Sequence, residues 1–542
     1  MRYVLVLTAA AIFAPTSAIA ADPPITFQTQ PFERLLSDLR AGADLIGGEK
    51  AVKALNASFK DKLSEKGFEG LDLNKPIVGY VILAPKPDDI VAVIAFPITG
   101  EKEFLSLCER INMGPKPKDL GKGLYEVPPL FPELPARMRF VEGYAYVATG
   151  KKPEPALDAK AIVPANKLYD PAENAAFTGK LHFDRLTPEV KAALITMLLD
   201  AKKSLLEKVD PDAPNSAALK PVFAELEKLA RRYLLLLGGA DTAALRLNFD
   251  PATGDVAVEA TLTPKPNTEL AKQIAARKPS KNQFAGLLTP DTVAGVHYSA
   301  PLFAEEIRSA YAALMEYQQK ETTENLPAAA KATVEELFKG QARTLKTGEF
   351  DFLVAVHGPD KNGHFSGVAA MSFEDPAALE KEFKKWMEND GPPEAFGTFK
   401  WNAGKAGNVN IHTFKPNGEF LNFAAKIFGD DCTLAFAFAP KAIFITLGPD
   451  AIATLKDAMK VKPVAAPAFD LVVNPTKLAQ LVEKGGGNAL TIQNALGKEK
   501  KLLSATSIHV TSGKELSVRF SVNLKVLPRA LYMSTAGAVV KD

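Results

Sequence analysis

Apolar and polar residues alternate at every step in several short stretches of this chain. The run LSVRFSVNLKV, from Leu516 to Val526, alternates throughout, and ALRLNF and VAVEATL do so on either side of the turn that begins at Asp250. A period of two buries one face of a strand and leaves the other in water, as in antiparallel sheets with one covered face. Turns rich in Asp, Pro and Gly join such strands into hairpins. The sequence therefore predicts an antiparallel sheet built from hairpins.

Each predicted hairpin is followed by a helical pattern or a short apolar segment. Hairpins precede amphipathic helices over residues 77–112, 243–277 and 349–388, and a hairpin precedes an apolar ending over residues 506–531. Asn267 is predicted to begin the second helix, and an Asp-Pro pair is predicted to begin the third. Such residues satisfy the free amides at a helix start.

The order of these elements recurs along the chain. The order over residues 70–277 is repeated over residues 345–531, and VEGYAYVATG (Val141–Gly150) matches APKAIFITLG (Ala439–Gly448) in pattern. A fixed order of matching elements indicates internal duplication. The polar stretch RKPSKNQ, residues 277–283, has no periodicity and is typical of a boundary.

We therefore predict an α+β protein made of two internally duplicated halves, residues 21–280 and 281–542. Each half is expected to contain antiparallel strands, in strand–helix and hairpin–helix units. Amphipathic helices are expected to cover one face of each sheet.

A second recurring motif joins a strand to a helix. GKLHFDRLTPEV contains His182 and AGVHYSAPLFAEE contains His297 at the matching place, where FDLVVNPTKLAQLV has Val472. Because the third copy lacks the histidine, packing or exposure is expected to decide the residue there. We predict that the two histidines mark starts of separate copies and do not share one metal ion, whose ligands would have to converge.

The other histidines are also predicted to be structural. His412 and His509 share strand faces with polar neighbours and, like His182, are expected to be solvated. His297 shares its face with small and apolar residues and is expected to be packed. Two further histidines flank the turn GPDKNG, where histidine is tolerated: His357 and His364.

No spacing in the chain is typical of a catalytic or metal site. HxxE, HxH, HExxH and GxSxG do not occur. The loops that begin at Asp210 and Asp360 lack the glutamate that a calcium loop has at its twelfth position. EKGGGNAL, from Glu483, lacks the Lys-Ser/Thr pair of a phosphate loop. We therefore assign no catalytic, cofactor-binding or metal-binding residue and no cofactor.

The N-terminal sequence, MRYVLVLTAAAIFAPTSAIAAD, is typical of a secretory signal peptide. Arg2 precedes a short apolar run, and Ala18 and Ala20 form the small-x-small pattern of a cleavage site. The run is shorter than the roughly 20 residues that a membrane span needs. We predict that residues 1–20 are removed near Ala20 and that the mature chain is periplasmic or extracellular, with no transmembrane segment.

Charge and cysteine content limit the partners and the covalent framework. The formal net charge of the 542 residues is +2, with both signs mixed throughout, which disfavours a nucleic-acid partner. Cys108 and Cys432 each lie on an apolar face, and two cysteines in an exported chain of this size do not form a disulfide framework. Both are predicted to be buried and unlinked.

The first third of the chain resembles a known kind of protein. A leading helix near residue 36 is followed by NKPIVGYVIL, DDIVAVIAFPITGEKEFLSLC, GLYEV and RFVEGYAYVAT, up to about residue 150. This order is similar to exported bacterial proteins grouped as domains of unknown function. The resemblance implies no activity and no site residues.

Three functions are compatible with these patterns. We predict an exported, non-enzymatic binding or scaffolding protein of the periplasm or cell envelope, whose partner is an unknown protein or an apolar ligand. One alternative is a carrier that holds an apolar ligand between sheet and helices. A second alternative is an exported hydrolase, which would bring two titratable groups together in a cleft, for instance His297 and a carboxylate.

Overall fold

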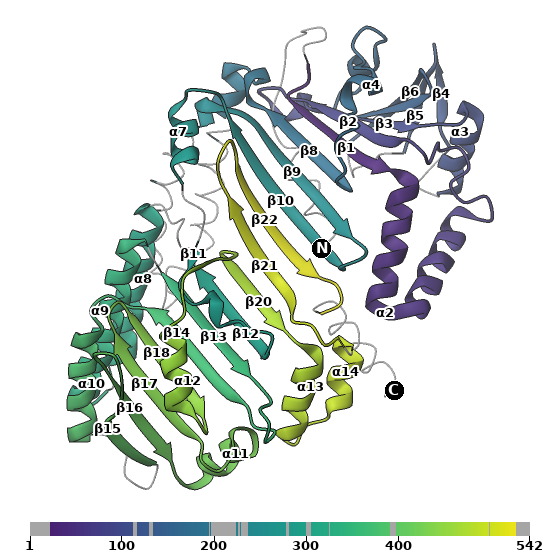
Figure 1. Ribbon diagram of the computed structural model, residues 1–542. Coiled ribbons are helices and arrows are strands. Elements are labelled where there is room, and N and C mark those ends of the chain that lie inside the picture. The colour runs from purple at the N-terminus through teal and green to yellow at the C-terminus, as the bar shows by residue number, and fades with distance from the viewer. Residues whose placement is uncertain are drawn as a thin grey trace. The chain divides into compact units, whose positions relative to one another are not determined.

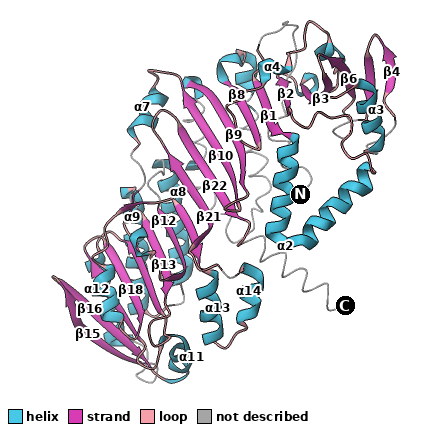
Figure 2. Cartoon of the chain, turned by 45° about the vertical axis from the view of Figure 1, so that its right-hand side comes forward, coloured by secondary structure: helices cyan, strands magenta, loops and turns pink. Residues whose placement is uncertain are grey.

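The computed structural model describes residues 22–526 with several gaps, which are residues 112–115, 129–133, 194–236 apart from four isolated positions, 278–280, 300–304, 325, 349, 391–396 and 498. The chain forms two compact units (Figures 1 and 2). Unit 1 contains the described residues up to 208, those from 237 to 277 and Ser512–Arg519, and unit 2 contains the rest.

Unit 1 is built on an antiparallel sheet. Its strands, in the order in which they pair, are β10 (Asp255–Pro264), β9 (Ala240–Asp250), β8 (Phe177–His182), β1 (Ile25–Pro31), β2 (Pro76–Ile82), β3 (Val91–Pro97), β7 (Tyr144–Thr149), β6 (Ala136–Val141), β5 (Leu124–Val127) and β4 (Lys118–Gly121). The first residues of β22 (Leu516–Asn523) lie beside β10. The helices of unit 1 are α2 (Phe32–Leu63), α3 (Glu101–Arg110), α4 (Ala165–Leu168) and α7 (Glu269–Ala276), with short 3-10 turns η1 (Pro87–Asp89), η2 (Glu154–Leu157), η3 (Phe183–Arg185) and η4 (Leu237–Gly239).

Unit 2 is also built on an antiparallel sheet. Its strands, in pairing order, are β21 (Leu503–Thr511), β20 (Phe469–Val473), β12 (Thr292–Ser299), β13 (Asp351–His357), β14 (Ser366–Ser372), β18 (Ala442–Gly448), β17 (Thr433–Ala439), β16 (Val409–Pro416) and β15 (Gly397–Ala406). A separate pair joins β11 (Lys281–Asn282) to β19 (Val464–Ala465). The helices are α8 (Glu305–Thr323), α9 (Ala328–Thr347), α10 (Pro376–Asp390), α11 (Gly418–Phe428), α12 (Ala451–Ala458), α13 (Pro475–Lys484) and α14 (Ala489–Leu496), with the 3-10 turn η5 (Ala285–Leu287). The predicted α+β class with antiparallel strands is therefore confirmed.

The sequence signals for helix starts are only partly correct. Asn474 caps α13, since its side chain accepts a hydrogen bond from the amide of Lys477 at 3.1 Å. In α7 the cap is Thr268, whose hydroxyl accepts from the amide of Ala271, and not Asn267 as the sequence suggested. Asn267 instead has a φ of 62°, a left-handed conformation that asparagine tolerates better than most residues.

Helices pack on both faces of part of each sheet, so the prediction of one covered face was wrong there. In unit 2, Leu455 of α12 packs in a core with Ala435 and Ala437 of β17, while Phe383 of α10 contacts Phe436 on the opposite face, with ring centroids 5.6 Å apart. The reason is visible in β17 itself, TLAFAFA, because neighbouring residues on both faces are apolar and both must be covered.

Unit 1 has the same layered arrangement. On one face, η2 and α4 pack against β2, β3 and β7, and Tyr146 accepts a hydrogen bond from the amide of Ala165 at 2.8 Å. On the other face, α3 packs with Phe104 and Leu107 against Met138 and Val147. No helix in the described ranges is long and apolar enough to cross a membrane.

Candidate functional site

A row of polar side chains crosses the sheet of unit 1. Gln28 on β1 lies opposite Thr178 on β8. Thr178 in turn lies opposite Arg246 on β9, and Arg246 lies opposite Glu259 on β10. Residues that face one another across antiparallel strands point to the same side of the sheet. We call these four residues the polar row of unit 1.

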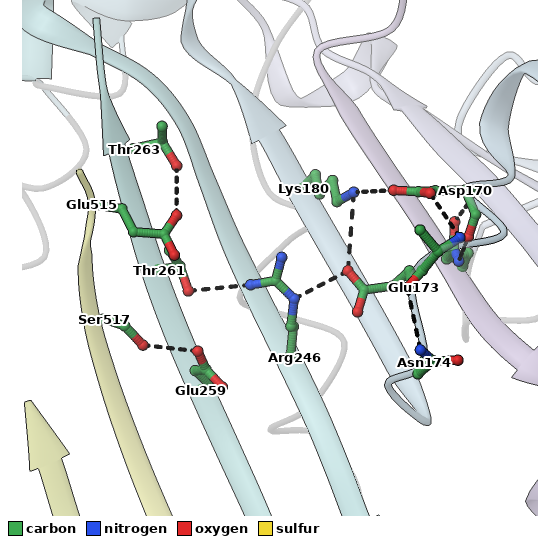
Figure 3. A network of polar contacts seen from close by, with 12 residues as sticks. Asp170, Glu173, Asn174, Lys180, Arg246, Glu259, Thr261, Thr263, Glu515 and Ser517 are labelled. Atoms are coloured by element: carbon green, nitrogen blue, oxygen red, sulfur yellow. Dashed lines mark hydrogen bonds and ion pairs between the residues drawn. The ribbon is translucent and has the colours of Figure 1, made fainter. Parts of the chain in front are cut away.

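The centre of the row is an ion-pair network (Figure 3). Arg246 donates from Nε to Glu173 Oε2 at 3.0 Å and from Nη1 to Thr261 Oγ1 at 3.2 Å. Lys180 Nζ lies 3.2 Å from Asp170 Oδ2 and 4.0 Å from Glu173 Oε2. The Glu173 carboxylate therefore pairs with cations on two neighbouring strands, β8 and β9.

The network continues beyond β10. Ser517 donates to Glu259 Oε1 at 2.9 Å, and the guanidinium of Arg519 lies 3.6 Å from Glu259 Oε2. Thr263 donates to Glu515 at 3.3 Å, as Figure 3 also shows. Polar contacts thus recur from β8 to the start of β22.

The loop before β8 supplies two of the carboxylates and is attached to the row. The side chain of Gln28 donates to the carbonyl of Asp170 at 3.0 Å and accepts from its amide at 2.8 Å. The hydrogen bond from Lys180 is the main reason that the pKa of Asp170 lies below its ordinary value. The loop therefore presents Asp170 and Glu173 in fixed positions.

Parts of this row are buried although they are polar. Gln28 is 5% exposed and Thr178 is 1% exposed, whereas Lys180 and Arg246 keep about a quarter of their side-chain surface open. The Thr178 hydroxyl has no hydrogen-bond partner among the described residues. Leaving a buried hydroxyl unbonded costs roughly 1–3 kcal/mol, so packing alone does not account for it.

Unit 2 carries a second polar row. His297 on β12 lies opposite Asp470 on β20, which lies opposite Ser507 on β21, and the Ser507 hydroxyl is 2.7 Å from that of Ser521 in β22. We call these four residues the polar row of unit 2.

His297 is buried, as the sequence predicted, with 1% of its surface exposed. Its Nδ1 lies 3.4 Å from the side-chain nitrogen of Asn282, a residue fixed by hydrogen bonds that its own oxygen accepts from the amides of Phe284 and Ala285. The amide nitrogen can only donate, so Nδ1 accepts and the ring is neutral. Burial, with a smaller contribution from the nearby charge of His509, lowers the pKa of His297 to about 4.

His297 and Asp470 form the kind of pair that would mark a hydrolytic site, but the hydrogen bonds do not support that chemistry. Asp470 accepts from the Ser504 hydroxyl at 2.5 Å, and burial raises its pKa. A nucleophilic serine needs a bond to a histidine base that a carboxylate orients. Among the described residues, Ser504 is bonded to the carboxylate and not to His297.

The remaining predicted histidines have different environments. His509 is exposed, as predicted, whereas His182 at the end of β8 is half-buried and burial lowers its pKa. His357 is partly buried, with Nδ1 3.4 Å from the Thr292 hydroxyl.

The prediction that His412 is solvated was wrong. It is 0% exposed, its Nδ1 accepts from the amide of Asn402 at 3.1 Å, and its Nε2 lies 3.1 Å from Glu380. Its ring lies 4.9 Å from that of Trp401 and 5.3 Å from that of Phe436. The aromatic residues at alternate positions of β15 and β17 were the sequence signal for a covered face here.

Both cysteines are free thiols. Cys432 is fully buried, while Cys108 is only half-buried, which corrects its predicted burial. Burial raises the pKa of Cys108 to about 11 and also raises that of Cys432. At neutral pH both therefore remain protonated and weakly nucleophilic.

We expect native protein to react slowly with an aromatic disulfide reagent and denatured protein to yield two thiols per chain. A Cys108→Ser variant should yield one thiol after denaturation and serves as the control. Finding no thiol in denatured, unreduced wild type would show that the two cysteines are bridged.

No group of three or more His, Cys, Asp or Glu side chains within the described ranges is arranged to hold a metal ion. No family model, curated protein or solved structure matches the chain. The resemblance of the first third to exported bacterial proteins of unknown function therefore remains a prediction.

Proposed function

We propose that this chain is an exported, internally duplicated, non-enzymatic binding protein, and that the sheet face bearing the polar row of unit 1 is its ligand-contacting surface. The observation that carries the proposal is the ion-pair network beside the polar row of unit 1, in which Lys180 and Arg246 keep about a quarter of their side-chain surface exposed.

The pairing orders support duplication. The strands of unit 1 from β9 to β4 and those of unit 2 from β21 to β15 can be matched one by one in their pairing order. Matched strands are followed along the chain by elements in the same order. Gly150 at the end of β7 and Gly448 at the end of β18 both have positive φ, 159° and 146°. These glycines end the two stretches that match in sequence.

Backbone hydrogen bonds outside the strand ladders correspond as well. The amide of Ile98 donates to Gly143, and the amide of Phe373 donates to Lys441, both at 3.0 Å. Ile98 follows β3 and Phe373 follows β14. Gly143 lies in the turn between β6 and β7, and Lys441 lies in the turn between β17 and β18.

A second pair of bonds joins β8 to the residue before β1, and the residue after β20 to β12. The amide of His182 donates to Pro24 at 2.8 Å, and the amide of Asn474 donates to Val293 at 2.7 Å. These bonds align β8 with β20 and β1 with β12, so that Gln28 corresponds to His297 and Thr178 to Asp470.

The corresponding rows differ in residue but not in polarity. On the next strand the face becomes apolar in both units, with Val78 opposite Gln28 and Leu353 opposite His297. Residues retained only for packing would be apolar here as well, because burying polar groups costs free energy unless they are bonded. Polar side chains at corresponding places favour a role beyond packing, and the partly exposed cations beside the row of unit 1 favour ligand recognition on that face.

Export is the first testable part of the proposal. We expect the mature chain to begin at Ala21 and to be recovered outside the cytoplasm, because the first residues have the pattern of a cleavable signal. N-terminal sequencing of the protein from fractionated cells measures this. A chain that keeps Met1 in the cytoplasmic fraction would contradict export.

Binding is the second testable part. We expect inorganic phosphate, succinate, triglycine or maltotriose to raise the melting temperature of the mature protein. A ligand at about 100 times its Kd adds about 2.7 kcal/mol, which corresponds to roughly 5–10 °C for units of this size.

The shift should be lost in Arg246→Ala and kept in Arg137→Ala. Arg137 is a matched control, since it also lies on a strand of unit 1 and pairs with two carboxylates, Glu126 and Glu154. An unchanged melting temperature with all four probes would contradict the proposed function.

A further inference from the structure

We infer that the polar row of unit 1, with the network around it, binds a neutral, hydroxyl-rich solute of the carbohydrate class. The inference rests on the proposed function and specifies the ligand of the face that it assigns.

The charges of the network are close to balanced. Three cationic side chains, Lys180, Arg246 and Arg519, lie among four acidic ones, Asp170, Glu173, Glu259 and Glu515. An anionic ligand would have to approach these carboxylates, and a cationic ligand would compete with bases already paired to them. A neutral ligand is not repelled by the carboxylates and does not compete with the paired cations.

The network offers donors and acceptors side by side. The cations have more N–H groups than their bonds use, and each carboxylate oxygen can accept more than one hydrogen bond. A sugar hydroxyl both donates and accepts, so it matches a surface on which both kinds of group alternate. Neighbouring strands lie about 4.8 Å apart, which sets a regular spacing for such contacts.

Arg246 is held as a rigid donor. Two of its nitrogens are fixed, by Glu173 and by Thr261, and Figure 3 shows the third nitrogen directed away from both. No hydrogen bond from this third nitrogen, Nη2, is found among the described residues. A donor fixed before the ligand arrives loses little conformational entropy on binding.

Partial exposure distinguishes this network from an ordinary core and from an ordinary surface. Thr178 and Gln28 form a buried floor, while Lys180, Arg246 and Glu259 keep roughly a quarter of their side-chain surface open to a ligand. Ion pairs on a fully solvated face contribute little and are seldom held in one geometry. Here the floor and the loop residue Glu173 hold them.

The test uses the mature chain on an array of neutral oligosaccharides and their uronate-bearing counterparts, followed by calorimetric titration of the strongest neutral ligand. We expect neutral oligosaccharides to bind and the affinity to change little between low and high salt, since screening acts on charged ligands. We expect Arg246→Ala to weaken binding at least tenfold and Arg137→Ala to leave it unchanged.

Glu259→Gln provides a second variant of nearly the same shape, and we expect it to weaken binding several-fold. It decides the question if Arg246→Ala fails to fold, which its melting temperature reveals. Binding that is equal in wild type and both variants would overturn the inference, as would an array on which no neutral oligosaccharide binds.

Binding of uronate-bearing sugars alone would also overturn the neutral class while leaving the proposed function intact. The same holds if phosphate, succinate or triglycine raises the melting temperature through Arg246 but no sugar binds. The failure of the inference is thus separable from the failure of the proposed function.

Discussion

Replacing His412 by alanine is expected to lower the free energy of unfolding by about 3 kcal/mol. The ring is buried against Trp401 and Phe436, so its removal leaves a cavity. The substitution also leaves the amide of Asn402 and the carboxylate of Glu380 without the partner that they have in His412. Denaturant unfolding at neutral pH, where burial keeps the ring neutral, measures the loss.

His509→Ala is the matched control for this prediction. His509 is also a strand histidine with polar neighbours in the sequence, but it is exposed, and its substitution should cost at most about 0.5 kcal/mol. Equal effects of the two substitutions would contradict the buried environment of His412.

The contrast between these histidines shows what the sequence could predict. Period-two alternation identified the hairpins correctly, because a strand with one solvated face alternates apolar and polar residues along its sequence. His412 was misjudged since its neighbour Asn410 suggested a wet face. The aromatic residues that contact His412 come from β15 and β17, and its partner Glu380 comes from α10; only the tertiary structure brings these elements together.

The polar rows could not be predicted for a related reason. Gln28, Thr178, Arg246 and Glu259 lie on four strands separated by long stretches of chain, and each alone is an ordinary polar residue of an alternating strand. Only the pairing registers place them opposite one another. The order of elements, by contrast, is a local property repeated in sequence, so the sequence could suggest duplication without a structure.

The second large effect is expected in the pH dependence of stability. The folded pKa of His297 is about 4, below the ordinary value of 6.5, so the unfolded chain takes up a proton first as the pH falls. The stability that the neutral His297 contributes is therefore fully present above pH 6.5 and is lost as the pH falls from about 6.5 to about 4. For this almost fully buried side chain, a difference of this size corresponds to about 3 kcal/mol.

Asp470, the residue opposite His297, acts in the other direction. Burial raises its pKa above 3.8, so the folded state takes up this proton before the unfolded state does, and stability rises as the pH falls through the folded value. Asp470→Asn should remove that gain and make the acid loss steeper. The variant keeps an oxygen that can accept the hydrogen bond from Ser504.

His297→Gln places at this position the residue type that Gln28 supplies in unit 1, and it removes the titrating group. We expect the urea midpoint of this variant to fall less than that of wild type between pH 7 and pH 4.5. A smaller acid loss should remain, since burial also lowers the pKa of His182, His357 and His412. Parallel midpoint curves for wild type and His297→Gln would contradict the prediction, because they would mean that His297 takes up its proton in the folded and unfolded states alike.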